Sequence, residues 1–124
     1  MRLLVDTHVL IRWAGGTPIA PDAGQAISDP AAEVWVSAAT VWESEIKIAL
    51  GKLAVDGDLV ESARDNGFTE LAVTFEHAVA AGRLPPHHRD PFDRMLIAQA
   101  RVEGLTVVTS DSAFTNYEVP LLAA

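Results

Sequence analysis

The amino-acid sequence predicts an α/β fold in which helices cover both faces of a central, mainly parallel sheet. Residues 3–5 and 106–109 are aliphatic or β-branched without polar alternation, which is typical of strands buried on both faces. Helical segments alternate with such strands along the chain, and this order favours parallel pairing. With 124 residues, the chain is expected to form one domain over residues 1–124.

The first half of the chain is predicted to begin with a strand, two helices and a second strand, and to continue with two more helices. Gly51 and Gly67 follow the last two helices, at the place where glycine commonly ends a helix. The predicted elements are a strand at 2–5, a helix at 7–14, a short helix near 23–28, a strand at 33–37, and helices at 39–50 and 59–65.

The second half contains the strongest helix signals. Pro91 is suited to a first helical position and Gly104 to a helix end, so a helix is predicted between them at 91–102. Pro85 and Pro86 lack an N–H and predict a loop at 85–89. The other predicted elements are a possible strand at 70–74, a helix at 76–81, a strand at 106–109 and a short strand near 119–122.

Composition excludes several classes of function. The chain has no cysteine, so it has neither disulfides nor thiolate metal sites. Its net charge of −8 has the wrong sign for a protein that holds nucleic acid on a broad basic surface. A metal-dependent nuclease is less affected by this charge, because cations neutralise its acids. The apolar N-terminal stretch is too short for a signal peptide or a membrane span, so a cytoplasmic protein is expected.

Four acidic residues carry the functional prediction: Asp6, Glu43, Asp93 and Asp111. Asp6 and Asp111 follow the two clearest strands, and Asp93 lies near the start of a predicted helix. Ligands of parallel α/β sheets bind beyond the carboxyl ends of the strands, so these acids are expected to meet there. Carboxylates in such a group repel each other unless a cation lies among them. Oxygen ligands favour Mg²⁺ or Mn²⁺, and hence metal-assisted chemistry on a phosphate.

Helix capping is the alternative explanation for the aspartates. Asp6, Asp90 and Asp111 each precede a predicted helix or turn, where Asp commonly accepts backbone N–H groups. Asp93, three residues after Asp90, resembles the second member of a capping box. Glu43 lies inside a predicted helix and is either solvated or an inward-facing ligand.

The other polar residues give weaker signals. The tandem His87–His88 in the Pro-rich loop is expected to be solvated. Arg89 and Arg94 either meet a phosphate or balance the neighbouring carboxylates. Ser37 and Thr40 either cap the helix that carries Glu43 or hydrogen-bond to metal ligands. The glycines form neither a Walker loop nor a dinucleotide fingerprint, which argues against a nucleotide cofactor.

Four motifs together resemble the PIN domain, and within it the VapC-type toxins of prokaryotic toxin–antitoxin pairs. They occur in order along essentially the whole chain, at residues 3–8 (LLVDTH), 37–43 (SAATVWE), 90–98 (DPFDRMLIA) and 107–111 (VVTSD). The resemblance implies a three-layer α/β/α sandwich. It also implies that the acids matching Asp6, Glu43, Asp93 and Asp111 form a site for Mg²⁺ or Mn²⁺, with Asp6 and Asp93 the most dependable ligands.

The resemblance further implies a function and partners. VapC-type toxins cut RNA endonucleolytically, commonly form homodimers, and are inhibited by a cognate VapB antitoxin that occludes the acidic site. Divalent cations would lower the pKa of a water molecule and neutralise charge on the phosphate. The rival interpretation is a catalytically silent PIN-like module that acts through protein contacts. A haloacid dehalogenase-type phosphatase would require a second Asp where this chain has His8.

Overall fold

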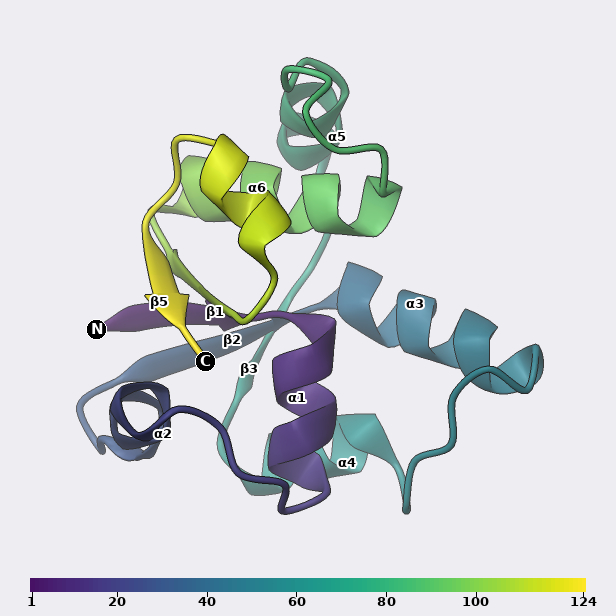
Figure 1. Cartoon of the computed structure of the whole chain (residues 1–124), viewed down its shortest axis with the longest axis vertical. Coiled ribbons are helices and arrows are strands. Elements are labelled where there is room, and N and C mark those ends of the chain that lie inside the picture. Colours follow the sequence, from purple (N-terminus) through teal and green to yellow (C-terminus); the bar gives the residue numbers. More distant parts are fainter.

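A computed structural model describes all residues 1–124 and has a five-stranded sheet at its centre. The strands are arranged in the order β3-β2-β1-β4-β5, and every neighbouring pair is parallel (Figure 1). They span Arg2–Val5 (β1), Glu33–Ser37 (β2), Thr69–Leu71 (β3), Thr106–Thr109 (β4) and Leu121–Ala123 (β5). The predicted parallel α/β fold is therefore confirmed.

Helices cover both faces of this sheet. They span Thr7–Ala14 (α1), Pro21–Ser28 (α2), Ala38–Ala49 (α3), Leu59–Asp65 (α4), Phe75–Gly82 (α5) and Pro91–Glu103 (α6), with a 3-10 helix at Ser112–Asn116. Figure 1 shows α5 and α6 above the sheet, α1, α2 and α4 below it, and α3 beside its right-hand end. None of these helices combines the length and the apolar character needed to cross a bilayer.

The central strand β1 supplies side chains to two separate cores. Leu4 is fully buried in the core beneath α5 and α6, where Leu96, Ile97 and Phe114 are also buried. Leu3 and Val5, which point the opposite way in the pleat, are buried in the core with residues of α1, α2 and α4. Because both faces are apolar, β1 is a continuous aliphatic run, and the polar residues begin where the strand ends.

Three predicted boundaries are wrong by two or three residues. Pro21 occupies the first turn of α2, so this helix begins before residue 23. Strand β3 ends at Leu71, because its pairing with β2 ends at Ser37 and Thr74 then caps α5. Strand β5 starts at Leu121, after Pro120, whose carbonyl accepts a hydrogen bond from Val107.

Helix caps fix the entry of α3 and α6 into the region beyond the strands. The Ser37 hydroxyl accepts a hydrogen bond from the N–H of Ala39 at 3.0 Å, which confirms its predicted capping role. Asp90 accepts from the N–H groups of Phe92 and Asp93 at 2.8 and 3.0 Å. Asp93 does not bond back to Asp90, so the predicted capping-box role of Asp93 is wrong and its carboxylate is left for other contacts.

Candidate functional site

The four predicted acids lie together beyond the carboxyl ends of β1, β2 and β4. Asp6 directly follows β1, Asp111 follows β4 by two residues, Glu43 is on α3 and Asp93 is in the first turn of α6. In Figure 1, the starts of α1, α3 and α6 surround this end of the sheet. The charge of Asp111 acts on Asp6 and that of Glu43 acts on Asp93, and each raises its neighbour's pKa.

Asp6 is a buried carboxylate with two protein donors. The hydroxyl of Thr109 donates to its Oδ2 at 2.5 Å, and the N–H of Val9 donates to its Oδ1 at 2.8 Å. Burial raises the pKa of Asp6, and these two hydrogen bonds oppose that increase. Asp6 is thus both the cap of α1 and a fixed acid at the site.

Glu43 is buried, with 4% of its surface exposed, so the solvated alternative for this residue is wrong. The Thr7 hydroxyl donates to its Oε1 at 2.7 Å, and the Lys47 ammonium donates to its Oε2 at 2.8 Å. Thr40 lies beside this group, with its Oγ1 3.4 Å from the Thr7 hydroxyl oxygen. The inward-facing side of α3 therefore holds a carboxylate that is already neutralised by one lysine.

Asp93 is the most electrostatically perturbed acid of the site. Burial raises its pKa to about 6, and the charges of Asp90 and Glu43 add to this increase. A contact of 2.7 Å between its Oδ2 and the Nε2 of His88 opposes it. A carboxyl group that is costly to ionise within the protein is one that a cation would stabilise strongly.

His88 belongs to the acidic group, so the prediction that it is solvated is wrong. Ligand atoms of His88, Asp93 and Asp111 all lie within 4.8 Å of one another. The backbone N–H of His88 donates to the hydroxyl of Tyr117 at 2.9 Å, which fixes the loop over the site. His87, its neighbour, is exposed and packs edge-on against the Tyr117 ring instead.

Arg94 fastens the same loop and forms no ion pair, so its predicted role of balancing carboxylates is wrong. Its guanidinium donates to the carbonyls of Ala81, Leu84 and Pro85 at 2.8 to 2.9 Å. A longer contact of 3.4 Å reaches the carbonyl of His88. Arg94 therefore bonds to backbone oxygens, with no carboxylate partner, and joins the end of α5 to the start of α6.

Asp111 is the exposed member of the group and also has a capping role. Its Oδ1 accepts from the N–H of Ala113 at 2.9 Å, at the start of the 3-10 helix. Its own N–H donates to the Thr109 hydroxyl oxygen at 3.0 Å. Thr109 thus connects Asp6 and Asp111 through one hydroxyl group.

The donor set fits a divalent cation. Carboxylate oxygens are the ligands preferred by Mg²⁺ and Mn²⁺, and an imidazole nitrogen can complete such a set. The open side of the site offers two carboxylates and the His88 ring within the reach of a single ion. Capping does not prevent ligation, since each carboxylate oxygen has two lone pairs.

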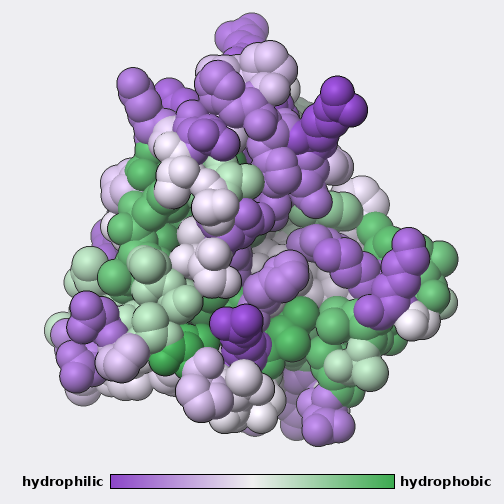
Figure 2. Space-filling view, viewed as in Figure 1, coloured by the Kyte–Doolittle hydropathy of each residue, from purple (hydrophilic) through white to green (hydrophobic).

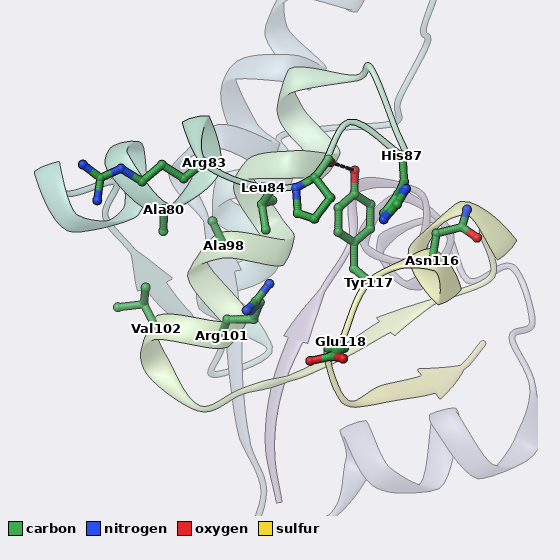
Figure 3. Close-up of a pocket in the computed structure, with 11 residues that line it drawn as sticks. Ala80, Arg83, Leu84, His87, Ala98, Arg101, Val102, Asn116, Tyr117 and Glu118 are labelled. Atoms are coloured by element: carbon green, nitrogen blue, oxygen red, sulfur yellow. Dashed lines mark hydrogen bonds between the residues drawn. The ribbon is translucent and has the colours of Figure 1, made fainter.

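The largest cavity lies elsewhere, between α5, α6 and the 3-10 helix, with a volume of about 720 Å³. Its lining includes Arg83, Arg101, Tyr117 and Glu118 (Figure 3). Figure 3 also shows the Tyr117 hydroxyl reaching Pro85, the 2.9 Å bond that holds the loop of His88. Glu118 is its only acid, so this cavity has no group of carboxylates comparable with the site above.

Solved structures share the whole fold with this chain at low sequence identity. VapBC2 from Rickettsia felis, bound to a DNA fragment from its promoter, is 11% identical with a TM-score of 0.71, over 99% of this chain and 98% of that one. DNA-bound VapBC from Salmonella typhimurium is 16% identical with a TM-score of 0.69, over 99% and 98%. VapBC-5 from Mycobacterium tuberculosis, of the VapBC family of toxin–antitoxin systems, is 18% identical with a TM-score of 0.61, over 98% and 96%.

Sequence comparison identifies the family. No curated protein sequence matches the chain. The family model of the PIN domain matches residues 3–120, which include all four predicted acids and His88. Together with the parallel sheet and the acidic group at its carboxyl edge, this match shows that the chain belongs to the PIN domain family.

Proposed function

We propose that the chain is a metal-dependent endoribonuclease of the VapC type, the toxin of a VapBC toxin–antitoxin pair. The observation that carries this proposal is the convergence of Asp6, Glu43, Asp93 and Asp111 at one edge of the sheet, together with His88. PIN domains are generally nucleases, and a phosphodiester is the substrate that an acidic metal site would serve.

In this proposal, Asp6, Asp93 and Asp111 hold Mg²⁺ or Mn²⁺ together with His88, and Glu43 completes the site. The bound cation would act as a Lewis acid on the phosphate and lower the pKa of a water molecule. Thr109 orients Asp6, and Thr7 orients Glu43, through their hydrogen bonds. Lys47 neutralises Glu43 and limits the repulsion that the acids exert on an anionic substrate.

A protein partner is part of the same proposal. The similar structures described above are VapBC complexes, which supports a VapB-type antitoxin as partner. Two large apolar side chains are exposed, Trp42 at 64% and Phe75 at 94%, and Trp42 packs against Phe92 beside Asp93; both suit a surface that another chain covers. Figure 2 shows hydrophobic surface at the α3 side of the molecule. The proposal also includes one domain over residues 1–124, a homodimer, and a prokaryotic cytoplasmic location.

The test is cleavage of RNA by purified, antitoxin-free protein. We expect cleavage at discrete sites with Mg²⁺ or Mn²⁺, none with EDTA, and none from Asp93→Asn under the same conditions. Folding of the variant would be verified by circular dichroism. Absence of cleavage by the wild-type protein across several RNA pools and both metals would contradict the proposal.

A silent interaction module is the second candidate, and one observation favours it. Asp6 and Asp111 do cap helices, so capping alone accounts for two of the acids. Asp93 and Glu43 accept no backbone N–H, and capping leaves them unexplained. Calorimetric titration with Mn²⁺ separates the candidates, because capping residues alone would not bind the ion jointly.

A further inference from the structure

A small groove between α1 and the end of α3 has a basic lining, in contrast to the rest of this acidic chain. Every residue of the groove that can carry a charge is basic. The lining residues are Thr7, His8, Ile11, Arg12, Lys47, Lys52 and Leu53. Lys47 and Lys52 are the only lysines of a sequence whose net charge is −8. Such a concentration of cations marks a place where an anion would be bound.

Two of these cations have no partner within the protein. Arg12 and Lys52 are exposed, and neither side chain forms an ion pair or a hydrogen bond. Figure 2 shows hydrophilic side chains over α1 and α3 in this part of the molecule. Their charges are therefore available to a ligand, and no internal contact would have to be broken to bind it.

The end of α3 holds the two lysines next to each other. The N–H of Lys52 donates to the carbonyl of Lys47 at 2.9 Å, and the N–H of Gly51 donates to the carbonyl of Ile48 at 3.0 Å. These two hydrogen bonds end the helix and require one residue in the left-handed backbone conformation. Gly51 supplies it, with φ of +71°. The backbone thus fixes the two lysines close together in the chain; the Lys47 ammonium is paired with Glu43, and the Lys52 side chain remains free.

The groove adjoins the acidic site through Glu43. Thr7 and Lys47 line the groove, and both donate to the Glu43 carboxylate, at 2.7 and 2.8 Å. Lys47 also interacts electrostatically with Asp90 and Asp93, which raise its pKa after the larger effect of Glu43. An anionic chain that lies in the groove would therefore be led directly to the carboxylates.

We propose that this groove binds the phosphates of an RNA strand on one side of the bond that is cleaved. The inference rests on the proposed ribonuclease function and adds the path of the substrate. An acidic site repels RNA, and a few localised cations next to it can restore affinity without a basic surface overall. Arg12 and Lys52 are the phosphate-binding residues, and the backbone of Lys47 and Gly51 positions Lys52.

The test compares two double variants that change net charge equally, both in the Asp93→Asn background to prevent cleavage. Arg12→Gln/Lys52→Gln removes the free groove cations. Arg83→Gln/Arg101→Gln removes two arginines that line the cavity of Figure 3 instead. Binding of a fluorescent single-stranded 12-nucleotide RNA is measured by anisotropy at several NaCl concentrations.

We expect the groove variant to weaken RNA binding about tenfold and to reduce the salt slope by about 1.4, which corresponds to two lost contacts at ~0.7 each for a single strand. The control variant should change affinity less than twofold. In the nuclease-active background, the groove substitutions should raise KM for RNA and leave kcat unchanged.

Three results would overturn the inference. Equal losses in both double variants would mean that only net charge matters, and no loss in the groove variant would mean that the RNA lies elsewhere. Unchanged RNA binding combined with lost binding of an acidic peptide would assign the groove to a protein partner. If the wild-type protein cleaves RNA with Mn²⁺ in any of these cases, the proposed function stands and only the groove assignment fails.

Discussion

The two sides of the acidic site differ in how the protein holds them. On one side, the anchored carboxylates Asp6 and Glu43 are each 4% exposed, and both receive two protein hydrogen bonds. On the other side, the open group of His88, Asp93 and Asp111 is partly exposed and crowded, with its ligand atoms within 4.8 Å. The anchored side is held by protein donors, whereas the open side contains Asp93, whose pKa is raised to about 6.

This difference indicates that protein hydrogen bonds hold the carboxylates on one side of the site, while the side chains on the other side are more accessible to a ligand. Glu43 is stabilised by the Thr7 hydroxyl and by Lys47. Asp6 receives two hydrogen bonds, although burial still raises its pKa. Asp93 has a pKa of about 6, so its ionised form without a cation destabilises the folded protein. Substitutions on the two sides should therefore have different effects on stability, on metal affinity and on activity.

The largest expected effect is the loss of cleavage when either side loses its principal acid. Asp93→Asn and Asp6→Asn should each reduce metal-dependent RNA cleavage at least ~100-fold, because removal of a ligand costs more than the 10–100-fold typical of an outer-shell change. Asp65→Asn, at an exposed position outside the site, is the matched control. Near-normal cleavage by one variant would remove that acid from the mechanism.

Asp93→Asn should lose activity but increase the stability of the metal-free protein. Its pKa is raised from 3.8 to about 6, so the folded state binds more protons than the unfolded state between those pH values. The contribution of Asp93 to stability is complete below pH 3.8 and is lost as pH rises through 6. Metal-free Asp93→Asn should therefore be more stable than the wild type at pH 7.5, by on the order of 2 kcal/mol.

Urea unfolding at pH 4 and pH 7.5 measures this effect. The advantage of Asp93→Asn should be small at pH 4 and full at pH 7.5. Mn²⁺ should reverse the order by stabilising only the wild-type protein, as expected for an ion that binds the native state. If Asp93→Asn were less stable than the wild type at pH 7.5 without metal, the ionised Asp93 carboxylate would not destabilise the folded protein, contrary to this prediction.

Thr109 connects the two sides, and its loss should have an intermediate effect. Thr109→Val removes the donor to Asp6 and the acceptor for the Asp111 N–H with little change of shape. We expect Mn²⁺ affinity to fall about tenfold, within the range for groups that orient ligands, together with a loss of about 1–2 kcal/mol of stability. Thr106→Val on the same strand, where the hydroxyl makes no hydrogen bond, should change neither quantity in calorimetry.

The smallest expected effect concerns the nitrogen ligand of the open group. His88→Ala should weaken Mn²⁺ binding several-fold to about tenfold and remove any imidazole ¹⁴N modulation from the electron spin-echo spectrum of bound Mn²⁺. His87→Ala, at the exposed neighbouring position, should leave both unchanged. A wild-type spectrum without ¹⁴N modulation would show that His88 holds Asp93 by a hydrogen bond and does not contact the ion.

The sequence predicts the place of the acids that follow strands better than that of the site residues on helices and loops, for a physical reason. Asp6 directly follows an uninterrupted aliphatic strand, so its place at the sheet edge follows from the pleat and the parallel order. The site position of Asp111 follows in the same way from β4. For Glu43 the sequence allows two alternatives, a solvated side chain or an inward-facing ligand, because the helix pattern of α3 alone does not determine which face is buried.

The place of His88 depends on contacts that are distant in sequence. Its loop is held by Tyr117, 29 residues later, and by Arg94, whose donors reach back to α5. Local propensity predicts only that a loop with two prolines is irregular. The end of β3 and the start of β5 are not predicted by the sequence for a related reason. Both are edge strands, and their bounds are set by the residues that pair with the neighbouring strand.

Arg94 also determines how this protein can vary in loop length. Most surface loops tolerate inserted residues, because the entropic cost of a longer loop is small. The loop between α5 and α6 differs, since Arg94 bonds to carbonyls at its beginning and near its end while the adjacent Asp93 faces the site. An inserted residue would force a choice between keeping the guanidinium contacts and keeping His88 beside Asp93. Diversification by insertion is therefore open to residues 54–57, between the basic groove and the Asp58 cap of α4, and closed to this loop.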